Sequence, residues 1–135
     1  MKRIASIVVA LVLCGLLPSC AQVLYAPQYQ KGTVSHVAIL YLKNHGDAGD
    51  RQKIIEATRE LRTIPGVYDI EVGTVLASDR PIVVSDYDLG IVVTFRDEAS
   101  MRAYLTHPKH QKAVKEVLTP LTSKIVVYDF VNQEY

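Results

Sequence analysis

The sequence lacks several features on which common protein functions depend. Cysteine occurs twice, at Cys14 and Cys20, so residues 21–135 can form neither a disulfide nor a thiolate metal site. The seven glycines are scattered and form no phosphate-binding loop, and there is no serine or cysteine nucleophile motif. Fifteen basic residues stand against 14 acidic ones, so the chain has no basic excess with which to bind nucleic acid.

An apolar run occupies the N-terminus. Lys2 and Arg3 precede 14 largely apolar residues, 4–17, and small residues follow. A run of this length is too short to remain as a membrane span, and its basic start and small-residue end are typical of a secretion signal. We therefore expect residues 1–19 to be a signal peptide that is removed.

The end of this signal, Leu17-Pro18-Ser19-Cys20, resembles the lipobox of bacterial lipoproteins. The resemblance implies that Cys20 is lipidated and anchors the protein to a membrane. Ala21 resembles the residue that directs lipoproteins to the outer membrane, which implies a place in the cell envelope, facing the periplasm. Ser19-Cys20-Ala21 also fits the small-x-small site of the ordinary signal peptidase, which would release a soluble protein, and this alternative stays open.

The mature chain has a balanced charge. Loss of Lys2 and Arg3 leaves 13 of the 15 basic side chains beside 14 acidic ones, a formal charge of −1. We therefore expect the lipid, not surface charge, to hold the protein at a membrane. Residues 20–33 show no helical or strand periodicity and predict a tether after the lipidated cysteine. Residues 34–135 suit one domain with a core of ordinary size.

Hydrophobic periodicity in this domain predicts four strands and two helices. The strands are expected at residues 34–43, 67–76, 86–95 and 124–131. The first helix is expected at residues 50–64, with Asp50 as N-cap and Pro65-Gly66 as its end. Asp97 caps the second helix, which His107-Pro108 interrupts.

The order βαββαβ predicts an α+β fold, a ferredoxin-like sandwich of one sheet and two helices. Helices then cover one sheet face only. The first, third and fourth strands nevertheless carry apolar side chains on both faces, for example Val92 opposite Ile91 and Val93. A large exposed apolar face is seldom left in water. We therefore expect a homodimer in which a second copy covers this face.

Five segments resemble the stress-responsive α/β-barrel (Dabb) family, in the right order across residues 34–131. They are Ser35-His36-Val37, Ile64-Pro65-Gly66-Val67, Tyr87-Asp88-Leu89-Gly90, Tyr104 with His107-Pro108-Lys109-His110, and Val127-Tyr128-Asp129-Phe130. The resemblance implies a dimeric α/β barrel in which two protomers bring their sheets face to face. It also implies that Asp88 is an ordinary sheet residue.

The same resemblance implies a candidate site. In polyketide cyclases of the family a histidine and a tyrosine act as an acid/base pair, and the motif places that pair on His110 and Tyr104; a further pocket histidine falls on His36. An imidazole with a pKa near 6.5 can take and return a proton near neutral pH. Alternatively, His110 fixes the helix kink through a backbone carbonyl, Tyr104 packs, and His36 lies in the core.

Two classes of function follow from these residues. The protein is either an envelope protein that binds a small molecule or serves a non-catalytic stress role, or a cofactor-free cyclase or lyase that acts on a carbonyl compound through His110 and Tyr104. His107 and His110 have no third ligand nearby, so we expect no metal. We expect His107 to mark a helix boundary and His45 to be solvated.

Overall fold

The computed structural model describes residues 31–133. The expected signal peptide, the lipidated Cys20 and nearly all of the expected tether lie outside these residues. The described elements, in chain order, are β1 (Val34–Leu42), α1 (Ala48–Glu60), a 3₁₀ turn η1 (Leu61–Thr63), β2 (Val67–Thr74), β3 (Leu89–Phe95), α2 (Glu98–Thr106), α3 (Pro108–Ala113), a π-helical segment η2 (Val114–Leu118), α4 (Thr119–Leu121) and β4 (Thr122–Val131).

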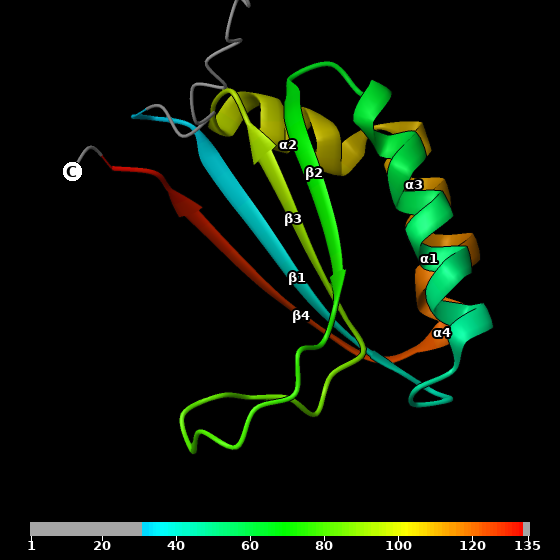
Figure 1. Ribbon diagram of the computed structural model, residues 1–135. Coiled ribbons are helices and arrows are strands. Elements are labelled where there is room, and N and C mark those ends of the chain that lie inside the picture. The colour runs from blue at the N-terminus through cyan, green and yellow to red at the C-terminus, as the bar shows by residue number, and fades with distance from the viewer. Residues whose placement is uncertain (1–30, 134–135) are drawn as a thin grey trace, which may run out of the picture.

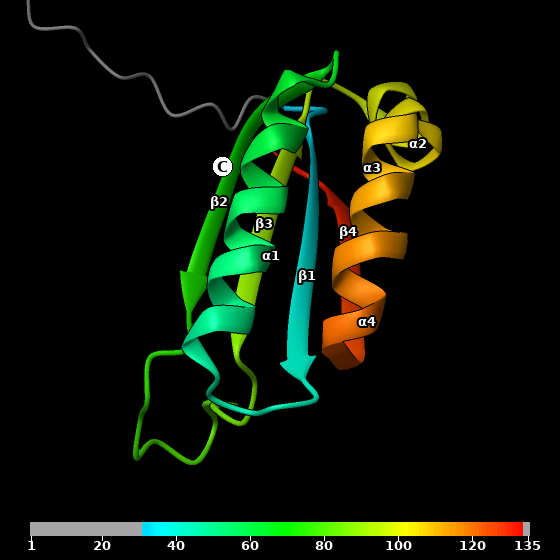
Figure 2. The same cartoon turned by 90° about the vertical axis from the view of Figure 1, so that its right-hand side faces the viewer.

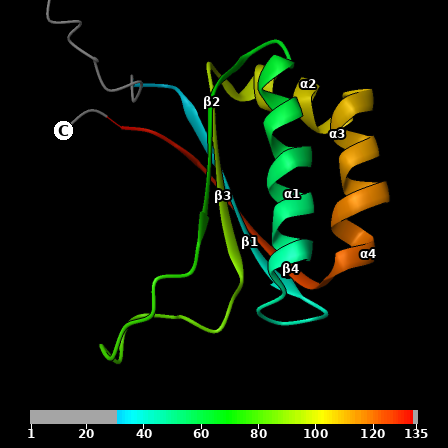
Figure 3. The same ribbon diagram turned by 45° about the vertical axis from the view of Figure 1, so that its right-hand side comes forward.

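The strands form one four-stranded sheet in the order β2-β3-β1-β4, and every neighbouring pair is antiparallel. The helices all pack on one face of this sheet, and the other face is open (Figure 1 and Figure 3). This is the two-layer ferredoxin-like α+β sandwich that the element order predicted, so the expected fold class is confirmed.

Alternation along β1 builds the core. Ala38, Leu40 and Leu42 are buried toward the helices, whereas Val37, Ile39 and Tyr41 point to the open face and are half-buried. Leu89, Val93 and Phe95 of β3 and Ile54 of α1 complete the centre of the core, all with almost no exposed surface. Because side chains alternate between the two faces of a strand, every second residue of β1 and β3 faces the helices, and these apolar residues form the core.

The first helix begins earlier than predicted because a different aspartate caps it. Asp47 is the N-cap, and its Oδ1 accepts a hydrogen bond of 2.7 Å from the backbone N–H of Asp50. Asp50 lies inside the first turn, where its carboxylate accepts bonds from Asn44 and Lys53. The helix ends in η1 before Pro65, as the Pro-Gly pair predicted.

Gly66 is fixed by both backbone and packing. Its φ of +89° lies in the left-handed region, and a Cβ at this position would lie 2.6 Å from Cβ of Ser100 on α2. The turn after η1 therefore requires glycine, and it sets how closely β2 approaches α2.

The second helical region bends where the sequence predicted. His107 is the cap shared by α2 and α3, and its Nδ1 accepts a hydrogen bond from the N–H of Lys109. Pro108 opens α3, since its missing N–H costs nothing in a first turn. His107 is thus a helix-boundary residue, as expected.

Asp88 has a role that the sequence did not predict. It is 2 % exposed and lies just before β3, not within a strand. Its carboxylate accepts bonds from the N–H of Gly46 at 2.7 Å, the N–H of Leu42 at 2.8 Å and Nδ1 of His45 at 3.1 Å. The interpretation of Asp88 as an ordinary sheet residue was wrong: it ties the β1–α1 loop to the start of β3. His45 keeps 68 % of its side chain exposed, so it is largely solvated.

The open sheet face is apolar, as the two-faced strands predicted. Cross-strand pairs such as Val37 with Val92, Val37 with Tyr128 and Ile39 with Val126 lie on it. Tyr128 and Phe130 remain 59 % and 51 % exposed. The long loop at residues 75–88 projects past this face (Figure 3) and exposes Leu76, Ile82 and Val84.

We predict that Asp88→Asn lowers the free energy of unfolding by about 2 kcal/mol at neutral pH, because it removes charge-assisted bonds to buried donors. Burial opposes ionisation of Asp88, but the bonds from Gly46, Leu42 and His45 outweigh it and hold the carboxyl pKa below its usual value. The stabilisation is therefore complete above the unfolded-state pKa of about 3.9 and is lost as pH falls through the lower folded-state pKa.

Urea denaturation at pH 6 and at pH 3 measures this difference. The exposed neighbour supplies the control: Asp86→Asn should change stability by less than about 0.5 kcal/mol. A wild-type to Asp88→Asn difference that does not shrink in acid would contradict the prediction.

Candidate functional site

Three of the sequence-predicted site residues meet under the helices. Tyr104 of α2 is 3 % exposed, and its ring centroid lies 4.4 Å from that of His110 on α3 and 6.3 Å from that of His36 on β1. Phe95 of β3 packs against the other side of Tyr104 at 4.9 Å. The helix break at Pro108 brings this about, because it lets α3 turn His110 back toward α2.

The hydrogen bonds of His110 define its protonation. Its Nδ1 lies 3.1 Å from the carbonyl oxygen of Leu105. A carbonyl can only accept, so Nδ1 carries the proton, and the neutral ring has its lone pair on Nε2. Burial, opposed by the bond to Leu105 and aided by nearby His36, lowers the pKa of His110. The neutral form with a basic Nε2 is therefore favoured at neutral pH.

His36 is oriented by a carboxylate. Its Nδ1 lies 2.7 Å from Oδ1 of Asp129, the residue directly opposite it on β4. Because the carboxylate accepts, Nδ1–H donates and Nε2 is left for another partner. No sequence pattern predicted a role for Asp129. The register of β1 against β4 reveals the pair, and periodicity within one strand cannot predict that register.

The hydroxyl of Tyr104 makes no hydrogen bond within residues 31–133, and because no fully buried side-chain nitrogen or oxygen in these residues lacks a partner, its oxygen keeps a small accessible surface. Burial of the phenol raises its pKa, so it stays protonated across the physiological range. A neutral phenol next to a neutral imidazole provides one donor and one acceptor with no net charge.

A cavity of about 30 Å³ lies among these side chains. Its other walls are lined by apolar or small side chains from the sheet, from α1 with η1 and from α3 with η2: Ala38, Thr58, Leu61, Ile91, Val93, Ala113, Val114 and Leu118. The volume has room for about one water molecule. The site is thus present as a small, partly open cavity, and a ligand much larger than water requires side chains to move.

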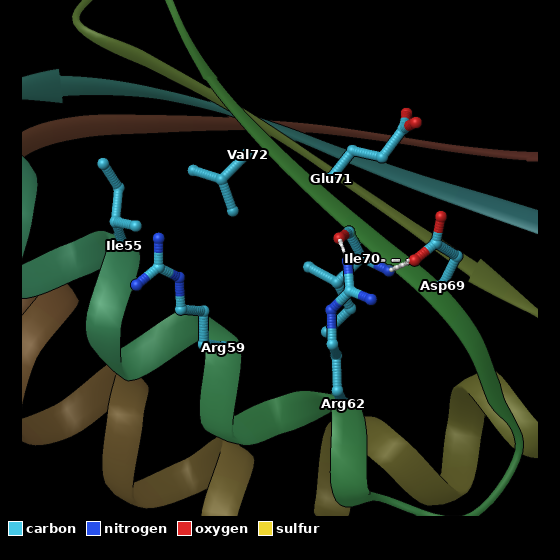
Figure 4. A pocket seen from close by; sticks show the side chains of 7 residues that line it. All are labelled: Ile55, Arg59, Arg62, Asp69, Ile70, Glu71 and Val72. Atoms are coloured by element: carbon cyan, nitrogen blue, oxygen red, sulfur yellow. Dashed lines mark hydrogen bonds and ion pairs between the residues drawn. The ribbon is translucent and has the colours of Figure 1, made fainter.

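A larger groove lies between α1 and β2, and an ion pair between Arg62 and Asp69 lies along it. The groove between α1 and β2 has a volume of about 670 Å³. Arg62 donates to the carbonyl of Ile70 and lies 3.0 Å from the carboxylate of Asp69, and Arg59 extends toward Ile55 (Figure 4). This arrangement has no nucleophile or acid/base pair, so its size alone does not make it the site.

Within residues 31–133, no group of three His, Cys, Asp or Glu side chains could hold a metal ion. No helix in this same stretch has the length and apolarity to cross a membrane.

The chain belongs to the family of the stress responsive A/B barrel domain (Dabb), whose model matches residues 34–132. This confirms the family resemblance drawn from the five sequence segments. No match was found among curated protein sequences.

Solved structures share the fold. A Dabb family protein with a ferredoxin-like fold from Mesorhizobium loti is 26 % identical; the match covers 77 % of this chain and all of that one, with a TM-score of 0.63. A dimeric ferredoxin-like protein of unknown function from Jannaschia sp. is also 26 % identical, covering 73 % and 98 % with a TM-score of 0.58. The hydroxynitrile lyase of Passiflora edulis is 21 % identical, covering 78 % and 98 % with a TM-score of 0.68, a likeness of fold.

The geometry defines what the cluster can do. The Tyr104 hydroxyl can donate to a carbonyl or hydroxyl oxygen, and Nε2 of His110 can accept a proton or hydrogen bond beside it. Because both groups are neutral, with Tyr104 buried and His110 half-buried, an ionic ligand would find no counter-charge from them. The cluster therefore suits a neutral polar group.

Proposed function

We propose that the protein is an envelope lipoprotein whose Dabb domain forms a homodimer and binds a small neutral carbonyl compound between His110, Tyr104 and His36. The observation that carries the proposal is the Tyr104 hydroxyl, a donor that makes no hydrogen bond within residues 31–133, on a side chain only 3 % exposed and with its ring centroid 4.4 Å from that of His110. Since its oxygen keeps some access to the outside, the hydroxyl is available to a water molecule or to a ligand.

The same contacts weigh against a purely structural role for His110. The carbonyl of Leu105 also accepts a bond from Nε2 of Gln111 at 2.5 Å. Removal of the imidazole would therefore leave this carbonyl bonded, and the kink does not depend on His110 alone.

A titration of the mature protein with 2-pentanone, a minimal neutral carbonyl probe, tests the site. We predict that Tyr104→Phe and His110→Ala each weaken binding about tenfold or more, because each removes a hydrogen-bonding group in a buried site. Tyr104→Phe keeps the ring and should cost less than about 1 kcal/mol of unfolding free energy, since it removes no hydrogen bond within the described residues. Calorimetry and thermal unfolding measure the two quantities.

Tyr68→Phe, which removes a hydroxyl from a residue 44 % exposed on β2, is the matched control and should leave binding unchanged. If the wild-type protein does not bind the ketone, or His110→Ala unfolds the protein while Tyr104→Phe binds normally, the structural interpretation of these residues holds.

A second candidate function is lyase or cyclase chemistry on a carbonyl substrate. It is supported by the same donor and acceptor, which could protonate an oxygen from Tyr104 and accept a proton at His110. The hydroxynitrile lyase from Passiflora edulis is similar in fold only, so it sets no substrate for this chain. Ketone turnover, or hydrogen exchange next to the carbonyl that Tyr104→Phe abolishes, would favour this second function over binding.

The homodimer is supported by the apolar open face and by the dimeric protein from Jannaschia. We predict that Val92→Asp yields a monomer or aggregate, because it places a charge in the centre of that face, opposite Glu71 of β2. Leu76→Asp, in the loop at residues 75–88 and 84 % exposed, is the control. Light scattering that gives the monomer mass for folded wild-type protein would contradict the dimer.

Lipid anchoring of Cys20 is supported by the lipobox-like end of the signal. We predict that Cys20→Ser releases the protein from the membrane fraction or leaves its signal uncut, since acyl chains provide the anchor. Cys14→Ser, inside the expected signal, should change neither location nor mass of the mature protein. Fractionation with mass spectrometry decides this, and wild-type protein found soluble and beginning at Gln22 would support the ordinary signal peptidase.

A further inference from the structure

The open sheet face has a hollow at one end. It has a volume of about 370 Å³ and is lined by Ile39 and Tyr41 of β1, by Lys124, Val126 and Tyr128 of β4 and by Val84 of the loop at residues 75–88. Tyr41 stands opposite Lys124 in the sheet, one residue beyond the pair of Leu40 with Leu89 at the start of β3. The hollow therefore lies where this loop enters the sheet, on the face that the proposed homodimer covers.

The floor of this hollow is largely apolar and accessible to water. Tyr128 is 59 % exposed, and Ile39, Tyr41 and Val126 are only half-buried. Apolar surface in a concave patch of this kind favours a partner that removes it from water.

The loop has a structured turn at its tip. The carbonyl oxygen of Arg80 accepts a hydrogen bond of 2.9 Å from the N–H of Val83, which makes Pro81 and Ile82 the central residues of a β-turn. The φ angle of Pro81 is fixed by its ring, and the N–H of Arg80 donates to Oγ of Ser78 at 3.2 Å. The tip thus has a defined shape before it meets a partner, so docking costs it little conformational entropy.

This turn presents an apolar side chain to water. Ile82 is 86 % exposed, so it packs against almost nothing in its own chain. The loop projects past the open face (Figure 3), whereas Asp88 at its end is bound to the N–H groups of Leu42 and Gly46. The base of the loop is therefore fixed, and its tip extends away from the sheet of its own protomer.

A second copy of the chain fits both features. Each protomer has one such tip and one such hollow, and two-fold symmetry lets each tip fill the hollow of the other protomer. Among the lining residues named above Lys124 alone is charged, and the exposed charged side chains of the loop are Asp79, Arg80 and Asp86, two acidic and one basic. Contact between the loop and the hollow of a second copy is therefore electrostatically favourable.

We propose that residues 78–83 form a dimer arm, whose Ile82 lies in the hollow of the partner subunit while the partner's arm fills the hollow of this one. This inference rests on the proposed homodimer and adds the segment of the second copy that covers this end of the open face. The exchange removes Ile82 and the exposed side of Tyr128 from water together.

Photo-crosslinking in cells that produce the full chain tests the arm directly. Benzoylphenylalanine in place of Ile82 is expected to give a covalent dimer on irradiation, and mass spectrometry of its peptides is expected to locate the link in β1 or β4. The same group in place of Ala103, which is exposed on α2 on the helical side, is the matched control and is expected to give no such dimer. A link to lipid, to a different protein or within one protomer would overturn the arm.

Removal of the apolar tip tests its contribution to affinity. Ile82→Ser is expected to raise the dimer dissociation constant about a hundredfold, since each of the two buried tips contributes roughly tenfold or more. Leu76→Ser removes a side chain of similar exposure, 84 %, two residues after β2 at the other edge of the sheet from β4, and is expected to leave the constant unchanged. Analytical ultracentrifugation of the mature protein over a range of concentrations measures the constant, and thermal unfolding checks that both variants fold.

The outcomes separate the arm from the homodimer. A wild-type dimer that Ile82→Ser does not weaken would overturn the arm and leave the homodimer in place. Folded wild-type protein that stays monomeric at every concentration would overturn the homodimer and the arm together. A weakened Ile82→Ser dimer, with a link from position 82 into the hollow of the other protomer, supports the arm.

Discussion

The packing of Tyr104 between Phe95 and His110 is the contact on which both the fold and the site depend. Its ring joins β3 of the sheet to α3 beyond the helix break, at centroid distances of 4.9 and 4.4 Å. The aromatic cluster therefore closes one end of the core while it places a phenol beside an imidazole. Aromatic packing of this kind contributes to stability beyond simple area burial, so loss of the whole ring would damage structure and chemistry together. Only the hydroxyl can be removed with the packing intact.

The sheet imposes the second constraint. Its helix-facing rows are covered by one layer of helices, and its other rows carry apolar side chains on β1, β3 and β4, such as Val37, Val92 and Tyr128. A side chain such as Phe130, which is 51 % exposed, gains on the order of 1 kcal/mol when its remaining surface is buried. Several such side chains on one face together favour a cover for that face by an amount that is large beside the effect of a typical single substitution. The cover and the helical layer therefore lie on opposite sides of the same strands, and the candidate site stays on the helical side.

The sequence was sufficient for the fold because each strand and helix carries its own periodicity and stop signals. Apolar alternation in β1, Pro65-Gly66 after η1 and Pro108 at the helix break all predicted local structure that the protein has. Predicted helix boundaries differ from the observed ones where two residues of the same type could serve as the cap. Asp47, not the expected Asp50, is the N-cap of α1. The buried bonds of Asp88 were missed because their partners, Leu42 and Gly46, lie more than 40 residues away in sequence.

The candidate site was predictable in its residues but not in its electrostatics. The motif predicted His110, Tyr104 and His36. Asp129, however, meets His36 only through the register of β1 against β4. The Nδ1–H form of His110 follows from its bond to the carbonyl of Leu105, which no motif specifies. These two contacts turn both imidazoles so that Nε2 is the free nitrogen. Because the Tyr104 phenol stays neutral and burial favours neutral His110, the proposed ligand would have to complete the hydrogen bonds of these two groups without bringing a charge that they cannot balance. The protonation states set by the surrounding fold thus restrict the proposed ligand chemistry more than the residue types alone do.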